Sequence, residues 1–219
     1  MDPAEGMLTL PGCLSASVCA TILDPEAVDG WGVTPTSGPS NVPVKLPLVQ
    51  YYGRRTPEED PQEYKGVVSR LAGSVSGRLS EDIEVRRSGV IIDGTSVGEK
   101  DEGVDMLAHV VDEFSGKSER SLTKRRLTST VNVVVVIGTT RVNDEIARRF
   151  ADEKTSLGEP IAVIFLDKSD GAVERSPALA EHARQAVIKE YFFGDSRRTL
   201  SPQIQQVDFS SLTLYKVPD

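Results

Sequence analysis

The residues that first suggest chemistry are Gly116-Lys117-Ser118, which match the end of the phosphate-binding loop GxxxxGK[ST]. In that loop, backbone N–H groups and a lysine surround the phosphates, and the hydroxyl group ligates Mg²⁺. The pattern also requires a glycine five residues before Gly116, where this chain has Val111, and an apolar strand that leads into the loop. Neither requirement is met, so the sequence predicts no nucleotide site at this position.

Other side chains with catalytic or metal-binding chemistry are few. The chain has two histidines, His109 and His182, and two cysteines, Cys13 and Cys19, without a CxxC spacing. Because a structural zinc site needs four such ligands in close pairs, these residues predict no zinc site. His109 falls beside the apolar face of a predicted helix, which favours a packed or surface histidine over a catalytic one. Neither GxGxxG nor GxSxG occurs.

Alternating strand and helix patterns predict an α/β fold. Two continuous apolar runs, residues 131–137 and 161–166, are typical of strands in a parallel sheet whose two faces are both covered. Between them, Val142, Ile146 and Phe150 mark one face of a helix, so these segments predict a βαβ unit.

Three more helices are predicted from periodicity and capping signals. One follows Asp60 and one precedes residue 116; the last begins at Ser176-Pro177, a capping residue followed by proline, and ends near Gly194. The predicted inward residues are Tyr64, Val67, Val68, Leu71, Val75 and Leu79 in the first, and Val104, Leu107, Ala108, Val111 and Phe114 in the second. Short strands are expected at residues 46–52, 90–93 and 212–217.

Two segments interrupt the alternation of strands and helices. Residues 24–47 are rich in proline and glycine and predict a long, loop-rich connection. Residues 116–130 form a basic insert, with five basic residues and one acidic residue, which makes the connection to the strand at 131–137 unusually long. We expect an exposed loop; a nuclear-localisation or RNA-contact segment is the alternative. Codons for this segment can contain splice signals, so we hypothesise a short intron retained in frame.

The charge and hydropathy of the whole chain exclude some classes of function. The 219 residues include 25 Lys+Arg and 33 Asp+Glu, a formal net charge of −8, whereas proteins that coat nucleic acid carry an extended basic surface. No apolar run approaches the roughly 18–20 residues that a membrane span needs, so we expect no membrane partner. With neither a signal-peptide pattern nor a disulfide framework, the composition predicts a soluble protein of the cytosol or nucleus.

Five stretches, in this order, resemble the central P-loop domain of the Clp family of cleavage-and-polyadenylation factors, and its fungal branch in particular. They are residues 2–12 (DPAEGMLTLPG), 44–49 (VKLPLV), 86–93 (RRSGVIID), 168–175 (KSDGAVER) and 188–194 (IKEYFFG). The resemblance covers nearly the whole chain except residues 116–130. It implies a three-layer, mostly parallel sheet of the P-loop NTPase type. It also implies that residues 1–219 are a single partial domain, truncated at its N-terminal strand and phosphate loop.

The resemblance also implies a small set of cofactor-binding residues. Asp2 matches the family's acidic residue near Mg²⁺ and phosphate, and Glu5 stands where the family has the glutamine of a DxxQ pattern. Arg175 matches the first of the two lid arginines with which the related polynucleotide 5′-hydroxyl kinases stabilise the transferring phosphoryl group, while Ala180 stands at the second position. A pairing of Arg175 with Glu174 is the alternative.

Two further features bear on catalysis. Asp93 ends the run at 90–93, where ligand sites of open α/β sheets gather, although a role in forming a turn is the simpler interpretation. The kinase members place an aromatic clasp for RNA just after this run, and Gly94-Thr95-Ser96-Val97 offers no aromatic ring. Since stacking contributes about 1–3 kcal/mol per base, this difference argues against kinase activity.

These observations predict a non-catalytic subunit, or a fragment of one, of the nuclear complex for pre-mRNA 3′-end cleavage and polyadenylation, where it scaffolds other subunits. The resemblance implies that intact members of the family bind ATP and Mg²⁺ and contact a partner factor that interacts with RNA polymerase II. Contact with RNA would then be indirect, through other subunits. Without the phosphate loop, we expect weak ATP binding or none. We also expect some apolar strands to be left without packed neighbours, so that copies of the chain tend to associate. The alternatives are an RNA 5′-hydroxyl kinase that uses ATP and an unrelated α/β interaction domain.

Overall fold

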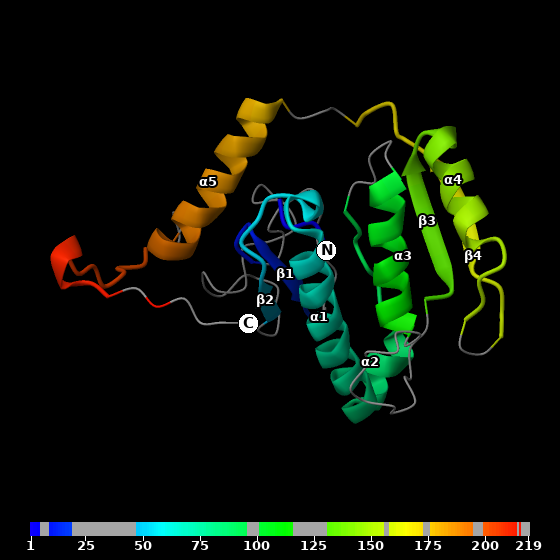
Figure 1. Cartoon of the computed structure of the whole chain (residues 1–219), viewed down its shortest axis with the longest axis horizontal. Coiled ribbons are helices and arrows are strands. Elements are labelled where there is room, and N and C mark those ends of the chain that lie inside the picture. The colour runs from blue at the N-terminus through cyan, green and yellow to red at the C-terminus, as the bar shows by residue number, and fades with distance from the viewer. Residues whose placement is uncertain are drawn as a thin grey trace.

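The computed structural model describes residues 1–4, 9–18, 47–95, 101–115, 131–155, 158–172, 176–194, 199–213 and 215. The predicted α/β class is confirmed, with a parallel pair of strands and helices packed beside it (Figure 1). The elements in chain order are β1 (Cys13–Ala16), β2 (Leu48–Tyr51), η1 (Pro57–Glu59), α1 (Pro61–Glu81), α2 (Ile83–Ser88), α3 (Asp101–Ser115), β3 (Val133–Gly138), α4 (Thr140–Phe150), β4 (Ala162–Asp167), α5 (Pro177–Phe193) and η2 (Phe209–Ser211).

β1 and β2 form an antiparallel pair in which Cys13 faces Tyr51 and Ala16 faces Leu48. The carbonyl oxygen of Gly12 closes one end of the pair, where it accepts hydrogen bonds from the N–H groups of Tyr52 and Gly53 at 2.9 and 2.8 Å. The strand predicted near residues 46–52 is therefore confirmed as β2, whereas β1 had no predicted counterpart.

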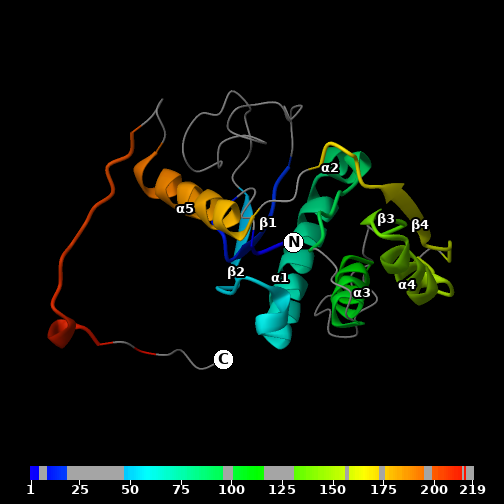
Figure 2. The same ribbon diagram turned by 90° about the horizontal axis from the view of Figure 1, so that it is seen from above.

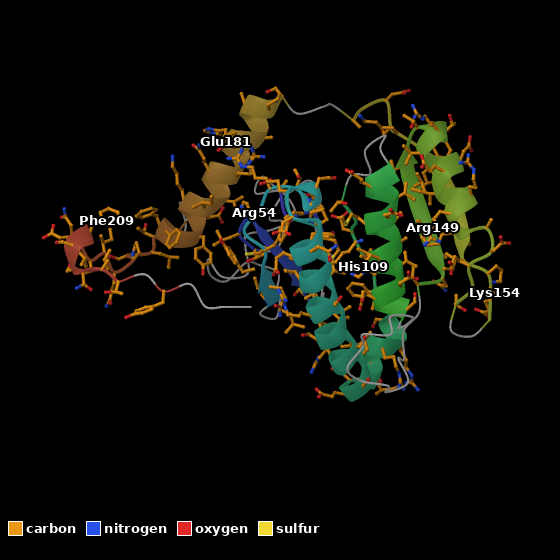
Figure 3. All side chains as sticks on the ribbon, in the orientation of Figure 1. Arg54, His109, Arg149, Lys154, Glu181 and Phe209 are labelled. Atoms are coloured by element: carbon orange, nitrogen blue, oxygen red, sulfur yellow. The ribbon has the colours of Figure 1, made fainter. Side chains whose placement is uncertain are left out.

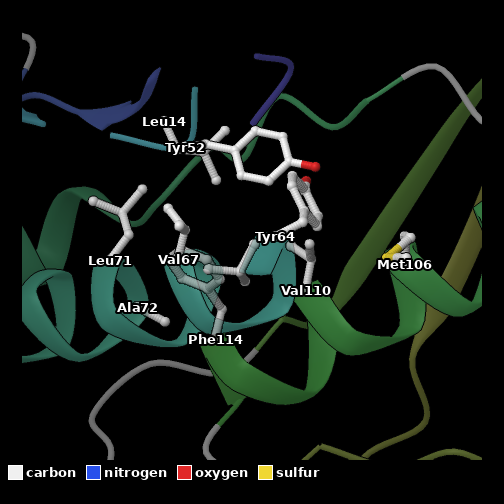
Figure 4. Close-up of a cluster of buried hydrophobic side chains, with 10 residues drawn as sticks. Leu14, Tyr52, Tyr64, Val67, Leu71, Ala72, Met106, Val110 and Phe114 are labelled. Carbon is white, nitrogen blue, oxygen red and sulfur yellow. The ribbon is translucent and has the colours of Figure 1, made fainter. Parts of the chain in front are cut away.

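α1 begins and packs as its sequence predicts. The Asp60 side chain accepts a hydrogen bond from the N–H of Glu63, and Pro61 occupies the first helical position. Its buried side chains are those of the predicted face, with Ala72 added and Val75 only partly buried. Tyr64 of α1 meets Tyr52 edge to face, with ring centroids 5.6 Å apart (Figure 4). These residues form a first hydrophobic cluster with Leu14 of β1.

α3 lies between α1 and the β3–β4 pair (Figure 1; Figure 2 gives the view from above). One side of α3 adds Met106, Val110 and Phe114 to the first cluster (Figure 4). The other side, with Val104, Ala108 and Val111, forms a second hydrophobic cluster with β3 and α4. The predicted apolar face is confirmed, but it is only part of the buried surface, because this helix has packed neighbours on two sides.

β3, α4 and β4 form the predicted βαβ unit. The two strands are parallel, and the register runs from Val133–Ala162 to Gly138–Asp167. Thr139 caps α4 through a hydrogen bond from the N–H of Val142, and Ile146 and Phe150 of α4 are buried in the second cluster.

The expectation that both faces of these strands are covered is wrong for the described residues. Val134 and Val136 of β3 are buried against α3 and α4, which both pack on the same face of the sheet. The opposite face, called the open face below, exposes large apolar side chains; the exposed fraction is 51% for Val135 and 68% for Ile137. The open face consists of Val133, Val135, Ile137, Ile164 and Leu166.

Two predicted strands are also not found. Residues 90–93 have irregular backbone, with Ile92 partly buried against the first cluster and Ile91 99% exposed. At the C-terminal end, residues 212, 213 and 215 follow η2 and form no strand. A strand requires a hydrogen-bonded neighbour, and no described segment supplies one at either place.

α5 has the predicted boundaries but packs little. Ser176 caps its start by accepting a hydrogen bond from the N–H of Leu179 at 3.2 Å, and Gly194, with φ of 77°, ends it. None of its residues is buried, and it stands apart from β4, with α1 and α3 between them (Figure 1).

Of the two predicted irregular segments, 24–47 lies outside the described residues except for Pro47, and 116–130 lies outside them entirely.

The two ends of the basic insert meet in the structure. Ser115, the last residue of α3, is buried, and its Oγ accepts a hydrogen bond from the N–H of Val131 at 3.2 Å. The residues on either side of 116–130 are therefore already in contact, so the helix-to-strand junction does not require the insert to span a distance.

We predict that replacing residues 116–130 by Gly-Gly keeps the fold. The free energy of unfolding should rise by no more than about 2 kcal/mol, because the cost of loop closure grows only as ~1.5RT ln n. Denaturant unfolding of this variant, compared with one in which the insert is replaced by a Gly/Ser segment of equal length, measures the effect. Loss of cooperative unfolding in both variants would show that the insert packs on the core.

Candidate functional site

Asp2 lies at a tight turn beside the first cluster. Its Oδ1 accepts a hydrogen bond from the N–H of Ala4 at 2.8 Å. The next residue, Pro3, is buried, and its carbonyl oxygen accepts a hydrogen bond from the N–H of Gly12 at 2.7 Å. The predicted Mg²⁺-proximal carboxylate is thus held on a fixed backbone, with one of its oxygens engaged by an N–H group.

The structure brings Asp2 and Asp93 to the same place. The amino group of Met1 donates a hydrogen bond to the carbonyl oxygen of Asp93 at 2.6 Å, and burial lowers the pKa of that amino group, an effect that Asp93 and Asp2 oppose. The Tyr64 hydroxyl donates a hydrogen bond to the carbonyl oxygen of Met1 at 3.2 Å. Burial raises the pKa of Tyr64, so its phenol stays protonated and remains a donor. Two acidic residues distant in sequence therefore converge beside one buried tyrosine.

The other residues implied for cofactor binding cannot be placed in this site. Glu5 and Arg175 lie outside the described residues, as do Ser96 and Val97 of the segment without an aromatic clasp. Ala180, at the second lid position, lies in the first turns of α5, and an alanine offers no charge to a phosphate. Asp170-Gly171 forms a turn, in which the carbonyl oxygen of Ser169 accepts a hydrogen bond from the N–H of Ala172 at 2.9 Å.

An ion-pair cluster joins α5 to the segment after β2, and sequence reasoning missed it. Glu181 pairs with Arg184 on the same helix and with Arg55 at 3.4 Å (Figure 3 labels Glu181). The hydrogen bond from Arg184, followed by that from Gln185, lowers the pKa of Glu181. Arg55 and Glu181 are far apart in the chain, and no spacing or motif in one sequence could have indicated their contact.

His109 is packed between α3 and α1, one of the two placements that the sequence favoured. Its Nε2 lies 3.2 Å from the carbonyl oxygen of Lys65 on α1 and 3.9 Å from Oε1 of the buried Glu113 (Figure 3). The imidazole therefore joins α3 to α1, and no described nucleophile accompanies it.

The remaining features of the described residues do not form a nucleotide site. A surface depression of 480 Å³ is lined by one stretch of α4 with mixed charge, far in sequence from Asp2; its residues are Thr140, Arg141, Asp144, Glu145 and Arg148. Among the described residues, no three His, Cys, Asp or Glu side chains gather as a metal site. No described helix is long and apolar enough to cross a membrane.

Known proteins share the sequence and the fold of this chain. Residues 1–194 match the family model described as the mRNA cleavage and polyadenylation factor CLP1 P-loop. The chain belongs to this family. A curated CLP1 factor of Pyricularia oryzae is 45% identical over 218 residues, and one of Botryotinia fuckeliana is 44% identical over 219 residues. In both comparisons the whole of this chain is covered but only 44% of the relative, so the chain spans less than half the length of these CLP1 proteins.

Two solved structures of Clp1p with Pcf11p share the fold. One, which concerns the extended interface of the two proteins and ATP loss in a point mutant, has a TM-score of 0.76 at 28% identity and covers 96% of this chain and 45% of that chain. The other, a wild-type complex, has a TM-score of 0.72 at 28% identity and covers 92% and 43%. The mixed α/β fold of the P-loop type expected from the sequence is therefore confirmed, although only two layers are seen at the β3–β4 pair among the described residues.

We predict that the purified chain binds ATP·Mg²⁺ with a dissociation constant weaker than the low-micromolar range. The N–H groups and the lysine of a phosphate loop supply most of the affinity for triphosphate, and the 219 residues contain no such loop. Titration calorimetry measures the affinity, with Asp2→Asn as the matched control, since an amide oxygen can still accept the Ala4 hydrogen bond. Tight binding that Asp2→Asn abolishes would contradict this prediction.

Proposed function

We propose that this chain is a non-catalytic part of the nuclear machinery for pre-mRNA 3′-end cleavage and polyadenylation, where it holds other subunits together. The observation that carries the proposal is the similarity of 96% of the chain to Clp1p as it occurs in a complex with Pcf11p. A partner of the Pcf11p type is accordingly the subunit that we expect this chain to bind. RNA would then be contacted indirectly.

The site geometry supports a scaffold over an enzyme. Phosphoryl transfer depends almost entirely on positioning and on electrostatic stabilisation of the transferred group. Of the groups that the family would use, this chain has Asp2, which like Asp93 lies near the Met1 amino group, but position 180 is alanine and the sequence contains no phosphate loop. Intact members of the family would hold ATP and Mg²⁺ near the positions of Asp2, Glu5 and Arg175. This chain has those three residues but not the phosphate loop or the second lid arginine, which would supply most of the contacts with phosphate.

We further propose that residues 1–219 act as one partial domain, from which residues 24–47 and 116–130 project as a loop-rich connection and a basic insert. The contact between Ser115 and Val131 supports this proposal for the insert, because the residues that flank the insert lie next to each other.

The direct test is binding to the Clp1p-binding segment of Pcf11p. We expect a one-to-one complex on size-exclusion chromatography with light scattering, and the Pyricularia oryzae CLP1 factor serves as positive control. If that relative binds and the folded chain does not, the scaffold proposal is wrong.

The alternative, an RNA 5′-hydroxyl kinase, is tested in parallel with a 5′-hydroxyl RNA oligonucleotide and radiolabelled ATP. We expect no transfer of label above a protein-free control. Transfer that requires Asp2 would favour the kinase over the scaffold.

A further inference from the structure

α5 stands apart from the two hydrophobic clusters. None of its residues is buried, and among the described residues no other helix or strand packs along its length. The views in Figures 1 and 2 agree that its C-terminal end points away from α1 and α3. Packing against the described elements therefore does not fix the position of this helix relative to the core.

The ion pair between Arg55 and Glu181 connects α5 to the described core. Nη1 of Arg55 lies 3.4 Å from Oε2 of Glu181. The same oxygen accepts a hydrogen bond from Arg184, and Gln185 donates one to Oε1 at 3.4 Å. These two hydrogen bonds, with that from Arg184 first, lower the pKa of Glu181, so its carboxylate is charged at neutral pH. Two neighbours on α5 thus hold a charged carboxylate where Arg55 can reach it.

The backbone that carries Arg55 is fixed to the first cluster. The N–H groups of Arg55 and Thr56 donate hydrogen bonds to Oε1 of Glu59 at 2.9 and 3.1 Å. The hydroxyl of Tyr52, a buried residue of the first cluster, donates a hydrogen bond to the carbonyl oxygen of Thr56 at 3.0 Å. Arg55 is therefore presented from a well-supported turn, whereas Glu181 lies on a helix without buried residues.

The ion pair is exposed to solvent and is therefore sensitive to salt. The exposed fraction of the side chain is 69% for Arg55 and 39% for Glu181. Exposed ion pairs contribute little net free energy, because water and salt screen the two charges. A contact of this strength can break and re-form while the rest of the protein stays folded.

We propose that Arg55 and Glu181 form an electrostatic latch that holds α5 beside the turn after β2, and that α5 moves away from the core when the latch is broken. The far part of α5 carries the exposed apolar side chains of Ile188, Phe192 and Phe193. The latch therefore sets where these side chains lie relative to the core. This conformational control does not depend on whether the chain binds Pcf11p.

The distance between two nitroxide labels on the full chain reports the position of α5. The natural cysteines, Cys13 and Cys19, are replaced by serine, and cysteines for labelling replace Ser74 on α1 and Ala186 on α5, which are both exposed. We expect a narrow distance distribution at about 0.01 M salt, where charges interact over about 30 Å. At about 1 M salt, where charges are screened within about 3 Å, the distribution should be at least twofold wider.

Substitutions at the latch separate it from a general effect of salt. Arg55→Gln and Glu181→Gln remove one charge from either side and should give the wide distribution at both salt concentrations. Arg55→Lys keeps the charge and should retain the narrow distribution at low salt. Arg70→Gln removes a different exposed ion pair, with Glu63 within α1, and is the matched control that should change nothing. Circular dichroism shows that each variant is folded.

Three results would overturn the proposal. The distribution could stay narrow at low salt in the folded Arg55→Gln and Glu181→Gln variants, or salt could widen it equally in Arg55→Gln and in the chain with Arg55. It could also be wide at low salt in the chain with both latch residues, which would show that they do not hold α5. Failure to bind Pcf11p leaves each of these measurements unaffected, so the two proposals fail separately.

Discussion

The burial of α3 on two sides is the interaction on which the rest of the structure depends. Met106, Val110 and Phe114 pack towards α1, while Val104 and its neighbours pack towards β3 and α4. A helix whose apolar residues face two neighbours is stabilised by packing against both of them. α3 thus joins an N-terminal unit, built on α1 and the β1–β2 pair, to the βαβ unit. At the α1 side, its His109 adds a polar contact with the Lys65 carbonyl oxygen.

This central helix also helps to explain why the backbone of Asp2 and Asp93 is fixed. Tyr64 packs in the first cluster and donates to the Met1 carbonyl oxygen, so the core beside α3 positions the backbone of Asp2 and Asp93. On the opposite side of α3, β3 pairs with β4 along one edge and with no other described segment, and its open face is apolar. Asp2, the residue that the resemblance implies near Mg²⁺, is therefore held by the core, and the 219 residues contain no GxxxxGK[ST] loop. The scaffold role proposed above for mRNA 3′-end processing is consistent with that combination.

Periodicity and capping predicted most of the fold because these signals are local. The Ser176-Pro177 start of α5 needs no partner elsewhere in the chain, and the apolar spacing of α1 and α3 reports the core that they share. The wrong predictions concern partners. The continuous apolar pattern of β3 indicates cover on both faces, and residues 90–93 have the composition of a strand, but a strand exists only beside another strand. In the site, a motif resemblance predicted Asp2, whereas Arg55–Glu181 depends on a tertiary contact that no local pattern encodes.

Amide hydrogen exchange in an Ile146→Val variant tests most directly the claim that α3 couples the two clusters. Ile146 is 2% exposed in the second cluster, and removing one methylene group from such a site costs about 0.5–1.5 kcal/mol. If α3 makes the two clusters one cooperative unit, the free energy of opening measured at the slow amides of α1, around Val67–Leu71, falls by the same amount as that measured in β3. An unchanged exchange rate in α1, with faster exchange confined to β3 and α4, would contradict the account.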